Sequence, residues 1–251
     1  MLNDLNRAIT PRGLPIDEEA GIPFAALKVA RELLHTASIV SLSTLDPVSA
    51  YPYGTLTNLA LEPDGSPFFF VARLALHARN IEADNRISLT LTGREHGDVL
   101  VRPRLTLVGK AILATRDEWE RMERRYLARY PKAKIYLSLP DAQFYRLETE
   151  DLQLNGGPAR NVTTDVTSET LKIDLTGADA LLAAEQDEIE RINSIPDEAS
   201  RIAAVAGAKQ DRWRVTGIDP EGIHFSGPKA SARLWFPSRV LTVDALRERL
   251  S

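Results

Sequence analysis

Several features are missing from this sequence, and each absence narrows what the protein can do. There is no cysteine, which excludes disulfides, thiolate nucleophiles, zinc fingers and iron–sulfur clusters and fits a reducing compartment. No stretch approaches the ~18 apolar residues that a membrane-spanning helix needs, and the N-terminus lacks the apolar core of a signal peptide. We therefore expect a cytoplasmic protein without a membrane partner.

An excess of basic charge is also missing. Lys and Arg total 31 against 35 Asp and Glu, which gives a formal net charge of -4 at pH 7. The Arg-rich stretch 115–130 carries acidic residues at helical spacing as well, a pattern typical of a solvated, ion-paired helix face. Because binding a phosphate polymer requires many unpaired cations, we expect no nucleic-acid partner.

Common catalytic motifs are absent too. The chain has no GxSxG elbow, no GxGxxG turn and no Walker loop, which argues against the usual nucleotide triphosphate chemistry. The four His residues are far apart in the sequence and form no helical HxxxH pair. They are His35, His77, His96 and His224. We therefore expect no metal site.

What is present indicates two folded parts. The chain has 251 residues, 43% of them hydrophobic and 26% charged, enough for a substantial core. Residues 1–22 contain Pro and Gly without any period and indicate an extended arm. Residues 23–160 form the first predicted domain, and residues 161–170, poor in apolar side chains, a linker. Residues 171–251 form the second, a small α+β domain.

The apolar periodicity changes along the first domain. Helical spacing predicts a helix at 23–35. Alternation then predicts strands, interrupted by a short helix at 76–85 and a capped helix at 115–130. The predicted strands are 36–45, 53–61, 68–71, 87–92, 104–114, 144–149 and 152–154. Antiparallel strands with few helices are typical of a barrel. For the second domain we predict helices at 178–192, 197–206 and 243–250 and strands at 213–218, 223–226 and 232–236.

One segment, residues 72–89, carries the candidate chemistry. It places Arg73, His77, Arg79 and Asn80 at the exit of a strand and in the first turn of a helix. Free backbone N–H groups and the positive end of the helix dipole favour an anion there. The segment therefore has the outline of a phosphate site. The alternative is a surface turn whose Arg side chains pair with the acidic residues at 82 and 84.

The same segment resembles the FMN-binding split-barrel family related to pyridoxamine 5'-phosphate oxidase, and in particular its heme-utilisation-like branch. The residues that match the branch pattern are Arg73, Leu74, Ala75, His77, Asn80, Asp84, Arg86, Ser88 and Leu89. Further matching stretches are 51–56, 103–109, 130–133 and 144–148. The resemblance extends over about residues 30–157.

The resemblance implies a fold and a cofactor. The fold is α+β, a six-stranded antiparallel FMN-binding split β-barrel followed by a small α+β domain, and the barrel forms a homodimer with FMN at the subunit interface. Arg73 and Arg79 would contact the FMN phosphate, with His77 and Asn80 as further donors. Thr55 and Arg104 would lie near the flavin ring or the ribityl chain. The protein, if active, would be a flavin-dependent oxidoreductase.

The sequence also departs from the family pattern. Ala72 and Ala78 replace a Ser and a Thr whose hydroxyls would face the phosphate, so FMN binding is expected to be weakened. In the second domain, the stretch 193–196 replaces the Asn-x-Asp-His of the branch. His224 is the one His of that domain, and we expect it to be a packed or surface residue.

These departures leave three functional hypotheses open. The first is an FMN-binding oxidoreductase-like protein. The second is a heme-binding or heme-utilisation protein on the same scaffold, and the third is a cofactor-free binding or regulatory member. In each case we expect the small-molecule ligand to contact only the barrel. We also expect a homodimer formed through exposed apolar strand faces around Leu105–Val108.

Overall fold

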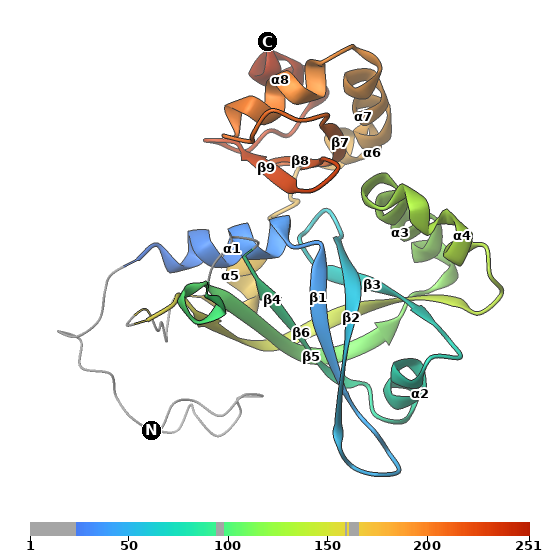
Figure 1. Cartoon of the computed structure of the whole chain (residues 1–251). Helices are drawn as coiled ribbons and strands as arrows, with labels where there is room; N and C mark the ends of the chain where they lie inside the picture. Colours follow the sequence, from blue (N-terminus) through green and yellow to red (C-terminus); the bar gives the residue numbers. More distant parts are fainter. Residues whose placement is uncertain (1–23, 94–97, 159, 161–165) are drawn as a thin grey trace.

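The computed structural model describes residues 24–93, 98–158, 160 and 166–251, so the expected arm at 1–22 lies outside the described residues. Its largest part is a closed antiparallel barrel of six strands in the order β1-β2-β3-β6-β5-β4 (Figure 1). The strands are β1 (Ile39–Leu45), β2 (Pro52–Leu61), β3 (Pro67–Ala72), β4 (Arg86–Thr92), β5 (Arg104–Leu113) and β6 (Ala142–Asn155). The expected fold class is confirmed.

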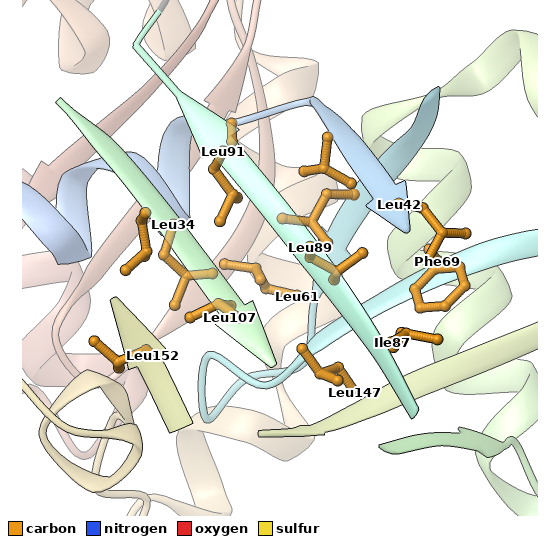
Figure 2. Packing of buried hydrophobic residues seen from close by; sticks show 14 of the residues in the cluster. Leu34, Leu42, Leu61, Phe69, Ile87, Leu89, Leu91, Leu107, Leu147 and Leu152 are labelled. Carbon is orange, nitrogen blue, oxygen red and sulfur yellow. The ribbon is translucent and has the colours of Figure 1, made fainter. Parts of the chain in front are cut away.

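Alternating side chains fill the barrel. In β4, Ile87, Leu89 and Leu91 are buried, whereas the residues between them are partly exposed. Because successive side chains of a strand point to opposite faces, these three face the interior. Figure 2 shows them packed against leucines of β1, β5 and β6. Burial of such side chains is the main force that closes the barrel.

Short helices cover the barrel. α1 (Ala26–Thr36) lies between the barrel and the C-terminal part, and α2 (Leu76–Ala83) lies at the far end of the barrel from that part (Figure 1). α3 (Arg116–Arg129) begins with a Thr115–Glu118 capping box and packs Met122 and Tyr126 on the outside of the sheet, against Phe68 and Phe144. The remaining elements here are the 3-10 turns η3 (Val99–Val101) and η4 (Pro131–Ala133) and the helix α4 (Lys134–Leu137).

The C-terminal part is a three-stranded sheet covered by helices. The sheet order is β7-β8-β9, from β7 (Arg214–Asp219), β8 (Gly222–Ser226) and β9 (Ser231–Trp235). The helices are α6 (Asp179–Ala183), α7 (Glu185–Ser194), α8 (Glu198–Val205) and α9 (Val243–Leu250). They enclose a core of their own, separate from the barrel interior. The predicted helix at 178–192 is therefore two helices, divided at Ala184.

The end of the predicted linker belongs to the barrel. The short helix α5 (Ser168–Leu171) lies there, and its Leu171 is buried in the barrel core. The backbone N–H of Ile173 also donates to the carbonyl of Asp64 in the β2–β3 turn, at 2.9 Å. The chain thus stays on the barrel for a few residues before it enters the C-terminal part.

Polar contacts fix the two parts together. On α1, Arg31 forms a 2.7 Å ion pair with Glu221, and Glu32 accepts a hydrogen bond from the indole N–H of Trp235. On α3, the buried guanidinium of Arg125 pairs with Glu185 at the start of α7. The C-terminal part is therefore held at a defined position on the barrel.

Two further observations concern surfaces. The strand face around Leu105–Val108 is expected to be exposed, but Leu105 and Leu107 point into the barrel and are almost completely buried. The expectation that the leucines around Leu105–Val108 form an exposed apolar strand face is therefore wrong, because the outward residues of this stretch are Thr106 and the half-buried Val108. In the described ranges, no helix is both long and apolar enough to cross a membrane.

Candidate functional site

The strand-to-helix segment has an open, basic surface. β3 ends at Ala72, the N–H of Arg73 donates to the carbonyl of Asp141, and α2 begins after Ala75, which provides no side-chain cap. The side chains of Arg73 and Arg79 are exposed and form no hydrogen bond or ion pair with the described residues. Asp84 pairs instead with Arg86, at 2.5 Å. The alternative of Arg side chains tied to acidic neighbours is thus not observed for Arg73 and Arg79.

His77 lies in the first turn of α2 and is half-buried. Burial lowers its pKa, because the charged imidazolium loses hydration. The ring is therefore neutral at pH 7 and has a lone pair available. Such an imidazole can accept a hydrogen bond or ligate a metal ion.

Asn80 and Ala78 face the barrel interior instead of the solvent. The amide nitrogen of Asn80 donates to Thr44 Oγ1 at 3.0 Å, and both residues are buried. Ala78 is fully buried in the barrel core beside Ile81. α2 therefore closes this end of the barrel. The expectation that a hydroxyl at position 78 would face a phosphate is wrong for this chain. Ala72, the other position where the family has a hydroxyl, is partly exposed.

The structure places Thr55 on β2 and Arg104 on β5. Thr55 is paired with Leu42 across β1 and β2 and shares its interior face. Arg104 is opposite Thr92, at the other end of β4 from Arg86, a separation of about 20 Å at the usual rise of a strand. Its guanidinium donates to the carbonyl of Val99 at 3.2 Å. Within one chain, the six candidate residues are therefore not all brought together.

A second feature, which sequence reasoning missed, is a pocket between the barrel and the C-terminal part. We call it the junction pocket; its volume is about 960 Å³, within the range of small-molecule sites. Aromatic and apolar side chains line it, among them Phe70, Tyr126 and Tyr130. Its cationic residues are Arg129, Lys132, Arg212, Arg214 and Lys229. They come from distant stretches of the chain, so no local motif signals the pocket.

A third feature is a buried polar cluster beneath α1. His35, Asp219 and His224 have ligand atoms within 4.8 Å of one another. Two His residues that are far apart in the sequence thus meet, because the docking of the two parts brings His35 and His224 together. His224 itself is packed, as expected.

A guanidinium already fills this cluster. Arg233 donates two hydrogen bonds to Asp219, at 2.6 and 2.8 Å, and a third to Nε2 of His224. It therefore occupies the position between carboxylate and imidazole that a metal ion would need. Burial and the charge of Arg233 lower the pKa of His224 to about 3, so the imidazole is neutral. This is a buried structural ion pair, with Arg233 in the role of the cation.

The six-stranded barrel and its basic strand-to-helix segment define the class: a split-barrel protein related to pyridoxamine 5'-phosphate oxidase. More specifically, the chain belongs to the CREG beta-barrel family, whose model matches residues 24–164.

Individual relatives extend this comparison. A structure of Atu2129 from Agrobacterium tumefaciens, a protein of unknown function, is 51% identical, with 97% of each chain covered and a TM-score of 0.86. Both parts of the fold are thus shared. A heme binding protein from Mycobacterium smegmatis is similar in fold, at 22% identity, coverage of 91% and 96%, and a TM-score of 0.55. A chloroplastic heme oxygenase of Arabidopsis thaliana, HOZ, is 30% identical over 143 residues; the match takes in 57% of this chain and 44% of the Arabidopsis protein.

Proposed function

We propose that this protein binds FMN at a homodimer interface, with the phosphate held by Arg73 and Arg79. The observation that carries the proposal is the pair of exposed guanidiniums without an intramolecular partner, beside the uncapped N-terminus of α2. The first N–H groups of a helix lack intrahelical acceptors, so they add donors for the same anion. Bound FMN would supply the redox chemistry, and the protein would supply binding and orientation.

A second copy of the chain is part of the proposal. Large apolar side chains are exposed on the β1–β2 hairpin, on β2 and near α2: Val48, Tyr51, Leu56 and Leu74. A two-fold interface would cover such a surface. Because Arg104 is at the opposite end of β4, it would contact the ligand only from the second copy.

Heme is the second candidate, favoured by the Arabidopsis relative that is named a heme oxygenase. Of the His residues that the structure describes, His35 and His224 are buried in the polar cluster. His77 is partly exposed and neutral, so it is the candidate to ligate a heme iron. Arg73 and Arg79 would then pair with the propionates.

Titration followed by absorption and fluorescence tests both candidates. Purified protein is titrated with FMN and, separately, with hemin at fixed ionic strength, because salt screens the Arg contribution. We expect saturable FMN binding. Arg73→Ala and Arg79→Ala should each weaken it by about 1.5–3 kcal/mol, the range for a hydrogen bond to a charged group.

Arg116→Ala is the matched control, since Arg116 is an exposed arginine at the start of α3. Loss of hemin binding in His77→Ala, with FMN binding absent from the wild type, would favour the heme candidate. Unchanged affinity in both Arg variants would refute the phosphate assignment. A protein that binds neither molecule would be a cofactor-free member.

A further inference from the structure

The junction pocket has an unusual charge distribution. Five of its lining residues are Lys or Arg, and the described residues that line it include no Asp or Glu. The whole chain has a net charge of -4, so the cations are concentrated here against the overall balance. Clustered cations around a concave, partly apolar surface favour an anionic ligand.

The cations come from both parts of the chain. Arg129 and Lys132, at the end of α3 and in η4, belong to the barrel side. Arg212 and Arg214 belong to the C-terminal part. The rest of the lining includes Ile39, Leu56, Phe70 and three tyrosines, whose rings can stack on a planar group. This arrangement fits a flat apolar body that carries acidic groups.

The start of β7 and the two residues before it explain why two arginines share one wall. Arg212, Trp213, Arg214 and Val215 alternate between exposed and buried side chains. Trp213 and Val215 pack into the core of the C-terminal part, and the two arginines beside them are exposed. Neither guanidinium forms a hydrogen bond or ion pair with the described residues. Both are available to a ligand.

The position of this wall is fixed. The buried Arg125–Glu185 pair and the His35–His224 contact join the two parts on the adjoining side of the molecule. A preorganised wall spends little free energy on ordering when a ligand binds. β3 also connects the junction pocket to the α2 segment, because Phe70 lines the pocket and Arg73 follows three residues later, about 10 Å along an extended strand.

We propose that the junction pocket binds the ligand with the C-terminal part as one of its walls, and that Arg212 and Arg214 are specificity-determining residues that select a flat apolar ligand with acidic groups. The proposal rests on the proposed function in one respect, namely that the ligand of the junction pocket is the planar, acidic cofactor that Arg73 and Arg79 bind. It replaces the expectation that ligand contacts are confined to the barrel.

Matched probes with and without acidic groups test the proposal. The probes are FMN with riboflavin, which lacks the phosphate, and hemin with its dimethyl ester, which lacks the carboxylates. The double variant Arg212→Ala/Arg214→Ala should bind the acidic member of at least one pair about tenfold more weakly, or worse, since hydrogen bonds to charged groups are lost. Affinity for the neutral member should change little.

One further variant and two controls separate a lost ligand contact from a lost fold. Arg212→Lys/Arg214→Lys retains the charge and should recover much of the affinity, whereas a merely structural loss would not be recovered. Urea unfolding of each variant checks that the fold is intact. Arg116→Ala again serves as the control for a lost surface charge.

The outcomes separate this proposal from the proposed function. If Arg73→Ala and Arg79→Ala weaken binding but Arg212→Ala/Arg214→Ala does not, the phosphate site stands and the C-terminal wall is refuted. If the reverse holds, the wall stands and the phosphate assignment is wrong. Equal losses for acidic and neutral probes, or no binding of either acidic probe to the wild type, would overturn the proposal.

Discussion

Nδ1 of His35 lies 3.2 Å from Nε2 of His224, across 189 positions of the sequence. Because Arg233 also donates to this Nε2, and a guanidinium can only donate, His224 accepts both hydrogen bonds and His35 donates through Nδ1. Nε2 of His35 is left buried without a hydrogen-bond partner among the described residues. The contact joins α1 of the barrel to β8 of the C-terminal part, and it requires Nε2 of His224 to be unprotonated.

Acid should therefore destabilise the protein well before its carboxylates titrate. Burial, and then the charge of Arg233, hold the pKa of both His35 and His224 below the ordinary 6.5. The unfolded chain takes up these protons as the pH falls below about 6.5, whereas the folded chain does not, so stability is complete above that pH and lost below it. Between pH 7 and pH 5 we expect a loss of about 2 kcal/mol for each His.

Urea unfolding at several pH values measures this loss. His35→Gln should unfold at lower urea concentration at pH 7, but with a weaker pH dependence between 6.5 and 5. His77→Gln, outside the cluster, should leave most of the dependence in place. A free energy of unfolding that stays constant from pH 7 to pH 5 in the wild type would contradict the buried neutral pair.

The ion pair of Arg125 and Glu185 should be costly to break. Both side chains are buried, and Glu185 Oε1 also accepts a 3.0 Å hydrogen bond from the N–H of Ile218. Glu185→Ala leaves a buried guanidinium without its counter-ion, which costs about 3–5 kcal/mol. Glu150→Ala, which breaks an exposed pair with Lys110, should change the midpoint of thermal unfolding very little. Similar midpoints for the two variants would contradict this account.

Gly109 should not tolerate a side chain. It lies at the register shift between β5 and β6, and a Cβ placed on it would approach the carbonyl oxygen of Glu148 to 1.9 Å. Gly109→Ala must displace backbone in a closed barrel, so we expect a loss of about 1–3 kcal/mol in urea unfolding. At Gly54 a Cβ meets no atom within 4 Å, and Gly54→Ala should be tolerated. An equal effect of the two substitutions would show that the strand relaxes freely.

Leu56 should lie in the dimer interface that we propose. Its side chain is 72% exposed on β2, and Val205 on α8 is similarly exposed at 70%. Leu56→Asp buries a charge if a second copy covers this face, so sedimentation should show a dimer for the wild type and a monomer for the variant. Val205→Asp should remain dimeric. A monomeric wild type at micromolar concentration would rule out the shared interface.

Most of the fold followed from local patterns. Alternation within β4 and β5, the Thr115–Glu118 capping box and the apolar spacing of α9 each reflect a physical preference of a short stretch of chain. These local preferences agree with the folded structure, because burial in the barrel interior stabilises the same pattern of apolar side chains. The division at Ala184 and the helix α5 were missed, since packing of a few residues decides them.

The candidate site, too, could be predicted from the sequence only in part. The sequence by itself determined the barrel, the small second domain and the basic turn with Arg73 and Arg79, because neighbouring residues encode a strand exit and a helix start. Only the tertiary structure decided that Asn80 faces inward, that His35 meets His224 and that Arg214 lines the same pocket as the end of α3. These contacts join residues far apart in the chain, and their geometry arises from how two separately packed cores dock.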